Sequence, residues 1–176
     1  MNNVTPDRAR ILRYCKWAAV VALLFIVISF HLLGISARTI GSESMGPNMH
    51  SGDLVFIRNV PSTGIVTHED GAISGYKTFG DYGNVILYRK YGRTDITPMI
   101  HRAMYYVESG EPMWDGGPIA PHAGYITKGD NKITNRQYDQ YGLCTEPIRE
   151  EWIDGVACFR VPYIGYATIT LSKILR

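Results

Sequence analysis

The most constraining feature of the sequence is an apolar run near its beginning. Residues 17–35 read WAAVVALLFIVISFHLLGI and contain no Asp, Glu, Lys or Arg. As a helix rising ~1.5 Å per residue, this run extends about 28 Å, close to the hydrocarbon thickness of a bilayer. A cleaved signal peptide is the alternative, with residues 34–37 as the cleavage site, but its apolar core is usually ~7–15 residues long. The run therefore favours a retained transmembrane anchor.

The charges around the run predict its orientation. Asp7 is the only acid before it, and Arg38 is the only basic residue that closely follows it, whereas the preceding segment carries Arg8, Arg10, Arg13 and Lys16. Basic residues accumulate on the cytosolic side of membrane spans. We therefore expect a cytosolic tail at residues 1–16, a transmembrane anchor at 17–36 and an extracytoplasmic catalytic domain at 37–176.

The remainder of the 176-residue chain is long enough for one domain with a core. Twelve tyrosines, eighteen glycines and nine prolines favour a mainly β, turn-rich domain. We expect loops or weak hairpins at residues 61–83, a Gly- and Pro-rich loop at 110–124 and a long polar loop at 132–150. Runs of β-branched and aromatic residues predict strands at 54–58, 85–91, 100–108, 125–128 and 155–161.

Composition also narrows the classes of partner and cofactor. A net charge of +2 gives no electrostatic sign of nucleic-acid binding. The cysteines Cys15, Cys144 and Cys158 lack metal-site spacing, and only the last two lie on the same side of the apolar run. The sequence His68-Glu69-Asp70 resembles a metal cluster, but neighbouring residues of a strand point to opposite faces. We therefore expect neither a metal nor an organic cofactor. The apolar segment 164–175 is too short for an obvious second span, and we expect it to pack on the core or lie at the membrane surface.

A serine in a predicted turn follows the anchor. Ser44 lies between small residues and is followed by Gly46 and Pro47, which favour a tight turn that can hold a hydroxyl outward. An ordinary turn serine is the alternative, because such residues are common in turns. The position of Ser44 just past the apolar run, and a histidine and two aspartates later in the chain, favour a functional role.

His101 differs from the other histidines because it lies inside a predicted strand. A polar side chain there needs a buried partner or a function. An imidazole, whose ordinary pKa is ~6.5, suits a general base for a serine hydroxyl, and a carboxylate can orient the ring. The candidate carboxylates are Asp130 and Asp139, both in the segment GDNKITNRQYDQ. Asp130 also has a plainer interpretation as a turn aspartate that bonds its own backbone.

Taken in order, these motifs resemble those of type I signal peptidases, in particular the endoplasmic-reticulum and archaeal branch. The matching segments are SESMGP, GDLVF, IHR, YITKGDN and FRVPYIG, which run from Ser42 nearly to the end of the chain. Residues 61–83 and 110–123 have no counterpart. The resemblance implies a signal-peptidase-like β catalytic domain behind one transmembrane helix. It also implies a serine endopeptidase that removes signal peptides from exported preproteins.

The resemblance further implies roles for individual residues. Ser44 matches the nucleophile, and His101 lies where the bacterial branch has a lysine. Ser42 matches a position whose hydroxyl helps to form the oxyanion hole, together with the backbone N–H of Ser44. Asp130 matches an acidic position of the family.

The third member of the triad departs from the family pattern. A second family aspartate usually follows the Gly-Asp-Asn aspartate by six residues, where this chain has Arg136, and the next aspartate is Asp139. We expect Asp139 to orient His101, because its segment is freer to reach across. We expect Asp130 to hold the loop or to support the site indirectly.

The family also implies partners and a location. The expected partners are preproteins cut after small residues at the outer membrane surface, membrane lipid and the secretion translocon. The location would be the cell membrane or the endoplasmic-reticulum membrane. One alternative is a non-catalytic membrane-anchored β-domain that acts as a subunit or binding module. A second is a serine hydrolase that uses Lys128 or Lys132 as its base.

Overall fold

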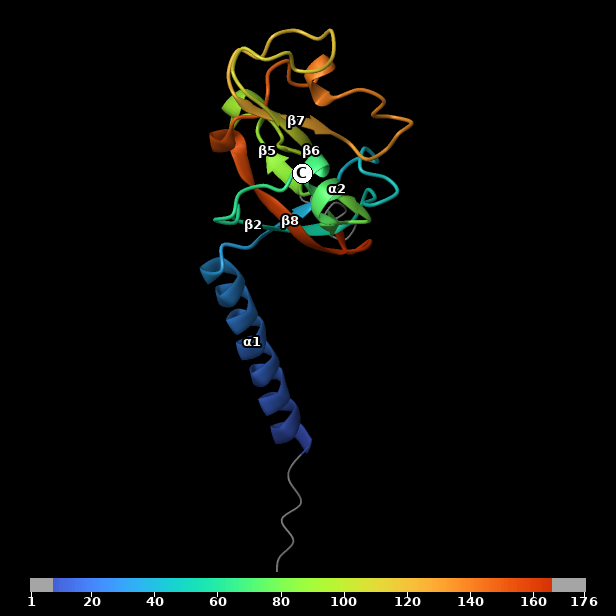
Figure 1. The fold of residues 1–176 in the computed structure, drawn as a ribbon. Helices are drawn as coiled ribbons and strands as arrows, with labels where there is room; N and C mark the ends of the chain where they lie inside the picture. The colour runs from blue at the N-terminus through green and yellow to red at the C-terminus, as the bar shows by residue number, and fades with distance from the viewer. Residues whose placement is uncertain (1–7, 166–176) are drawn as a thin grey trace, which may run out of the picture. The chain divides into compact units, whose positions relative to one another are not determined.

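The computed structural model describes residues 8–165, and the chain divides into two compact units, Met1–Ser36 and Ala37–Arg176. Helix α1, Arg8–Leu32, belongs to the first unit (Figure 1). Its segment Arg10–Phe30 is long and apolar enough to cross a membrane. A signal sequence near an N-terminus can meet the same criteria of length and apolar composition, so the helix alone does not distinguish the two.

The second unit is mainly β, as predicted. Its main sheet has six strands in the order β1-β2-β8-β5-β6-β7, and β3 (Lys77–Thr78) pairs with β4 (Asp81–Tyr82) in a separate hairpin (Figure 1). The strands of the main sheet are β1 (Ser36–Thr39), β2 (Leu54–Arg58), β5 (Val85–Tyr88), β6 (Met99–Val107), β7 (Gly124–Lys128) and β8 (Ile153–Val161).

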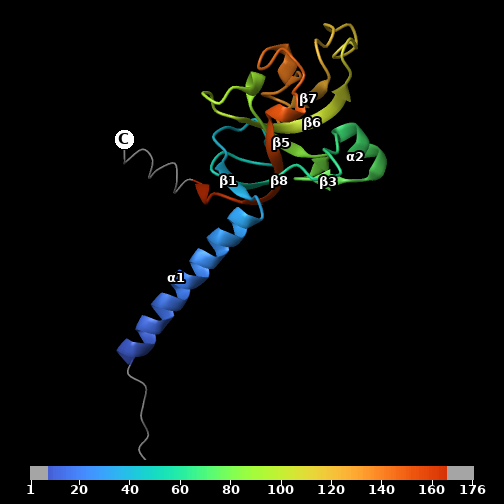
Figure 2. The same cartoon turned by 90° about the vertical axis from the view of Figure 1, so that its left-hand side faces the viewer.

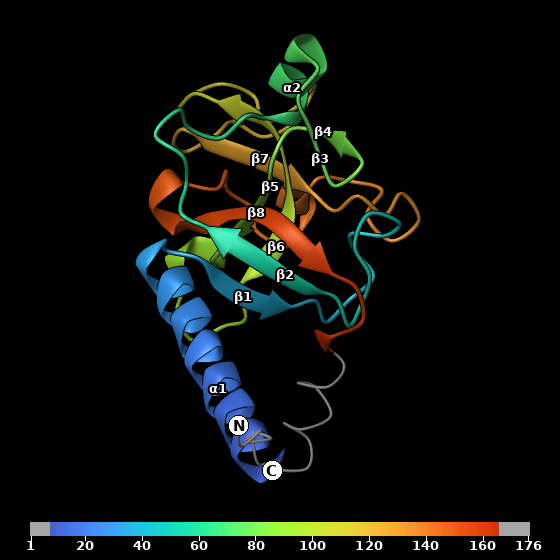
Figure 3. The ribbon, with the colours of Figure 1, turned by 90° about the horizontal axis from the view of Figure 1, so that it is seen from below.

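The last strand completes the centre of the sheet. Strand β8 pairs antiparallel with both β2 and β5, so this late segment lies between two segments from the first half of the domain (Figure 3). Strand β6 pairs antiparallel with β5 and β7, and this register sets His101 opposite Ile86 on β5. Pairing with β5 thereby fixes the position of His101, and pairing with β7 begins at the next residue, Arg102.

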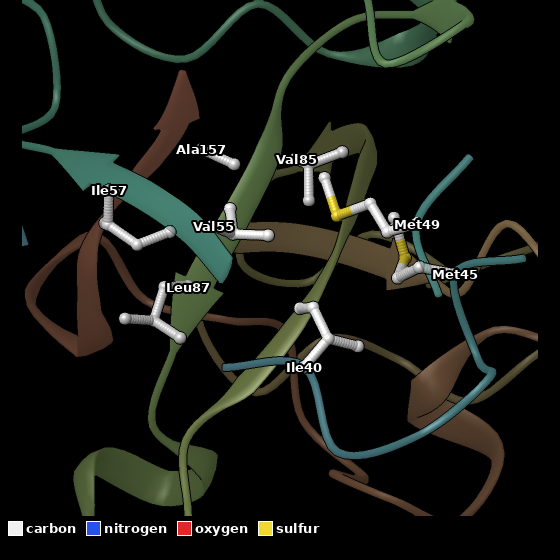
Figure 4. Close-up of a cluster of buried hydrophobic side chains, with 8 residues drawn as sticks. All are labelled: Ile40, Met45, Met49, Val55, Ile57, Val85, Leu87 and Ala157. Carbon is white, nitrogen blue, oxygen red and sulfur yellow. The ribbon is translucent and has the colours of Figure 1, made fainter. Parts of the chain in front are cut away.

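The core beneath the sheet anchors the turn that carries Ser44. A cluster of eight buried residues joins β2, β5 and β8 to this turn, from which Met45 and Met49 contribute fully buried side chains (Figure 4). Burying a methionine side chain stabilises a fold by about 1.5–3 kcal/mol. The whole cluster consists of Ile40, Met45, Met49, Val55, Ile57, Val85, Leu87 and Ala157.

The prediction of only loops or hairpins at residues 61–83 was incomplete. Helix α2, His68–Ser74, lies in this segment ahead of the β3–β4 hairpin, and it packs beside β4 and β6 (Figure 2). Thr67 caps the helix in a capping box with Asp70. The sequence signal was Thr-x-x-Asp, but seven residues are too few to show helical periodicity. The segment His68-Glu69-Asp70 therefore forms a helical turn, and the argument from a strand was wrong.

Several boundaries also differ from the prediction. The strand predicted at 85–91 ends at Tyr88, and a 3-10 turn, Lys90–Gly92, follows it. The predicted polar loop 132–150 contains the 3-10 turn Asp139–Tyr141. Strand β1 was not predicted, because four residues carry too short a pattern. Most of the apolar segment 164–175 lies outside the described residues.

Candidate active site

Three side chains that are distant in sequence meet at one end of the sheet. The Nε2 atom of His101 lies 3.0 Å from Ser44 Oγ, and its Nδ1 atom lies 2.7 Å from Asp139 Oδ2. The side chains of His101 and Asp139 are each 1% exposed. When Nδ1 donates its hydrogen to the carboxylate, the lone pair of Nε2 faces the hydroxyl. The imidazole can then accept the proton of Ser44.

Local backbone structure holds Ser44, His101 and Asp139 in place. Ser44 opens a turn in which the N–H of Gly46 donates to the carbonyl of Glu43 at 3.0 Å. His101 lies within the paired region of β6. Asp139 begins a 3-10 turn, and its carbonyl accepts the N–H groups of three following residues, Gly142, Leu143 and Cys144. The three residues therefore sit on backbone that is itself hydrogen-bonded.

Two hydroxyl groups complete the surroundings of Asp139. Its Oδ2 atom accepts hydrogen bonds from Tyr88 Oη at 2.9 Å and Thr127 Oγ1 at 2.6 Å, besides that of His101. Burial raises the pKa of the carboxyl, but the hydrogen bond and charge of His101, followed by the two hydroxyls, outweigh it. The pKa of Asp139 is therefore lowered, and the group stays ionised.

Tyr88 and Thr127 were not identified from the sequence. Burial, and then the neighbouring charge of Asp139, raise the pKa of Tyr88 well above its ordinary value, so the phenol remains a donor. The only available signal was a hydroxyl-bearing residue within each apolar strand segment, VILY and YIT. Such residues are common in strands, and only the tertiary structure shows which ones face a carboxylate.

Asp130 has different partners. Its carboxylate accepts two hydrogen bonds from Arg102, from Nε at 2.8 Å and Nη2 at 2.6 Å, and one from Asn48 Nδ2 at 2.8 Å. The side chains of Arg102 and Asp130 are only 1% and 5% exposed. The third guanidinium nitrogen, Nη1, donates to the carbonyls of Thr78, Tyr82 and Gly83 in and beside the β3–β4 hairpin. The structure thus brings Asp139, and not Asp130, to His101.

Of the other residues considered from the sequence, Ser42 lies beside Ser44, whereas Lys128 and Lys132 do not. Ser42 Oγ lies 3.1 Å from Ser44 Oγ, on the same side as the candidate nucleophile. Lys128 donates its ammonium to the carbonyl of Arg136 at 3.0 Å, so this lysine is engaged away from Ser44. Lys132 is exposed and lines a different cleft, one formed with Glu43 and Asn131. Neither lysine takes the place of His101 beside the serine hydroxyl.

A mostly apolar cleft of about 340 Å³ adjoins Ser44 and His101. Residues of the edge strand β1 and the segment after it form one wall, and the start of β6 forms another. The residues that line this cleft are Arg38, Thr39, Ile40, Gly41, Ser42, Ser44, Leu87, Thr97, Pro98, Met99, Ile100 and His101.

Within residues 8–165 no group of His, Cys, Asp or Glu has the arrangement of a metal site.

The sequence left open whether Cys144 and Cys158 form a disulfide. Cys144 is a buried free thiol, and burial raises its pKa. Cys158 is exposed, and its Sγ donates to the carbonyl of Phe56. Neither forms a disulfide in the structure.

A hydroxyl, an imidazole and a carboxylate in line beside an apolar cleft form the arrangement of a serine hydrolase. Comparison with known proteins narrows the class further. No family model matches the chain. It is 29% identical over 132 residues to the signal peptidase complex catalytic subunits SEC11 of Pyricularia oryzae and Sclerotinia sclerotiorum, and 28% identical over 134 residues to that of Neurospora crassa.

Each match covers 75% of this chain and 61% of the relative, so the chain spans about three fifths of the length of these proteins. The chain is therefore similar in sequence to SEC11 catalytic subunits of the signal peptidase complex. This agrees with the family that the sequence motifs indicate.

Proposed function

We propose that the protein is a membrane-bound serine endopeptidase that removes signal peptides from exported preproteins. The observation that carries the proposal is the contact of buried His101 with both Ser44, at 3.0 Å, and Asp139, at 2.7 Å. The homology to SEC11 catalytic subunits supports the same reaction and the same class of substrate. The chemistry needs no metal or organic cofactor.

In this mechanism Ser44 Oγ attacks the carbonyl carbon of the scissile bond while His101 Nε2 takes its proton. Asp139 stabilises the imidazolium ion that results. The carbon–nitrogen bond then breaks, and the imidazolium gives the proton to the leaving amine. Water, deprotonated by the same imidazole, hydrolyses the acyl-enzyme. The Ser44 backbone N–H and the Ser42 hydroxyl hold the oxyanion, and losing one such donor typically costs ~10²–10³ in rate.

The apolar cleft supports the choice of substrate. Strand β1 lies at the edge of the main sheet, so an extended peptide can pair with it and direct small side chains into the cleft. Ser44 follows the apolar run by only nine residues. Such a short tether keeps the nucleophile near the membrane surface and raises its effective concentration at a membrane-bound substrate. Membrane lipid and the secretion translocon are the further partners that we propose.

Incubating the detergent-solubilised full chain with a preprotein tests the proposal. We expect cleavage after an Ala-x-Ala site, detected by the mass and N-terminal sequence of the product. A non-catalytic subunit or binding module would leave the preprotein intact. Loss of activity in Lys128→Ala or Lys132→Ala, with a normal His101→Lys variant, would instead support a Ser–Lys mechanism.

Cleavage is expected to rise as the pH increases from acidic to neutral, because a general base must be unprotonated to act. The sign follows from the role of His101 as proton acceptor, because only the neutral ring can take the hydrogen of Ser44. The measurement is kcat/KM against pH with a peptide that spans the cleavage site. A rate that still climbs steeply above about pH 9 would indicate a lysine base.

The proposed topology puts the N-terminal tail in the cytosol and the β domain outside. A membrane-impermeant thiol reagent is therefore expected to modify exposed Cys158 in spheroplasts, and Cys15 only after permeabilisation. Variants that keep only Cys15 or only Cys158 separate the two signals. A variant that keeps only the buried Cys144 serves as the unreactive reference. Labelling of Cys15 alone in intact spheroplasts would contradict this topology and support the reverse orientation.

A further inference from the structure

The carbonyl groups of Glu43 and Ser44 lie on either side of the Ser44 α-carbon, and both accept hydrogen bonds from one residue, Asn131. Asn131 donates its backbone N–H to the carbonyl of Ser44 at 2.9 Å and its side-chain Nδ2 to the carbonyl of Glu43 at 2.8 Å. We propose that Asn131 is a positioning residue that aims the Ser44 N–H at the oxyanion of the reaction. This inference rests on the proposed function and deepens its account of the site.

The geometry of the peptide bond links Asn131 to the oxyanion. In a planar trans peptide the C=O and N–H groups point in opposite directions. The Glu43 carbonyl points toward Asn131, so the N–H of Ser44, which belongs to the same peptide unit, points away from it. The two sides open to different clefts. Glu43 and Asn131 line one, while Ser42 and Ser44 line the other, which also holds His101.

The orientation of the Asn131 amide is itself determined. Its Oδ1 atom accepts the N–H groups of Ile133 at 3.0 Å and Thr134 at 3.3 Å. These two donors require the oxygen on their side, so the NH₂ group faces the Glu43 carbonyl. Gly129 permits the close approach, because a Cβ atom there would lie 2.5 Å from the Ser44 carbonyl oxygen. Asn131 therefore acts on the backbone of Ser44 through fixed hydrogen bonds.

Two variants remove the Nδ2 donor, and only the first of them keeps the Oδ1 acceptor. Asn131→Asp keeps the acceptor for Ile133 and Thr134 but removes the donor to Glu43, and Asn131→Leu removes it without adding a charge. We expect both to lower kcat about tenfold to a hundredfold, less than the ~10²–10³ for outright loss of an oxyanion donor, with little change in KM. The matched control is Thr134→Val, which loses a hydrogen bond to Asn135 in the same loop.

A peptide aldehyde separates positioning from mere stability. Ser44 Oγ adds to the aldehyde carbon, its proton passes to His101, and the former carbonyl oxygen carries the charge in the oxyanion pocket. We expect the affinity for the aldehyde to fall in parallel with kcat in both Asn131 variants. Binding of the same peptide with an uncleavable amide, measured in a Ser44→Ala background, is expected to stay unchanged, as is thermal stability to within a few degrees.

The outcomes are distinct. Asn131 variants with wild-type kcat and aldehyde affinity overturn the positioning role while leaving the proposed function intact. The positioning role is also overturned if the variants lose as much affinity for the uncleavable peptide as they lose for the aldehyde. A wild-type protein that neither cleaves a preprotein nor binds the aldehyde contradicts both the proposed function and this inference.

Discussion

Replacing Ser44 with alanine is expected to abolish cleavage of a preprotein and to leave the fold intact. Removing the nucleophile of a serine protease lowers kcat on the order of 10⁶-fold. Within residues 8–165 the hydroxyl forms hydrogen bonds only with the side chains of His101 and Ser42, so its loss removes few hydrogen bonds. The turn remains anchored by Met45 and Met49, whose side chains are fully buried.

The Ser44→Ala measurement compares the initial rate and the thermal unfolding midpoint of purified variant and wild type. Ser109→Ala is a suitable control, because Ser109 is an exposed serine whose hydroxyl donates to the carbonyl of Pro121 at 3.5 Å. Cleavage by Ser44→Ala well above that of a mock preparation would show that another residue is the nucleophile.

Replacing Asp139 with asparagine is expected to lower turnover by up to roughly 10⁴-fold without abolishing substrate binding. The amide is neutral, so it cannot stabilise the imidazolium of His101 as the carboxylate does. If its nitrogen instead faces the ring, it forces the wrong tautomer, and Nε2 then presents a hydrogen to Ser44. When the amide oxygen occupies the place of Oδ2, it can still accept the hydrogen bonds of Tyr88 and Thr127, so the fold is expected to persist.

Replacing Asp130 with asparagine is expected to act mainly on stability. The change leaves the guanidinium of Arg102 buried without its counter-charge, and breaking one partner of a buried ion pair typically costs about 3–5 kcal/mol. A lower unfolding midpoint should therefore accompany any loss of activity in this variant. The contrast between the two aspartates separates a role in catalysis from a role in holding the loop.

A third carboxylate provides the control for this comparison. Asp154 pairs with Arg89 at 2.7 Å, and Asp154→Asn removes a carboxylate from a salt bridge that has no contact with Ser44, His101 or Asp139. Its activity is expected to match that of wild type. If Asp139→Asn cleaves normally while Asp130→Asn is inactive yet as stable as wild type, then Asp130 is the acid of the triad.

Local features of the chain were sufficient to predict the apolar helix and most strands of the main sheet. The apolar run predicts a helix that can span a membrane, because length and hydropathy are properties of consecutive residues. The β-branched and aromatic segments predict five of the six strands of the main sheet for the same reason. Ser44 and His101 could be proposed because each lies in a short motif. Helix α2 and strand β1 escaped prediction, because few residues carry their pattern.

Contacts across the sheet were decided by the tertiary structure. Sequence left Asp130 and Asp139 as rivals, because the distance from a carboxylate to His101 depends on the path of residues 129–139. That path directs Asp130 to Arg102 and Asp139 to His101. The register of β5, β6 and β7 likewise brings Tyr88 and Thr127 to the same carboxylate. Hydrogen bonds between residues dozens of positions apart are determined by strand pairing and core packing, which a local pattern does not encode.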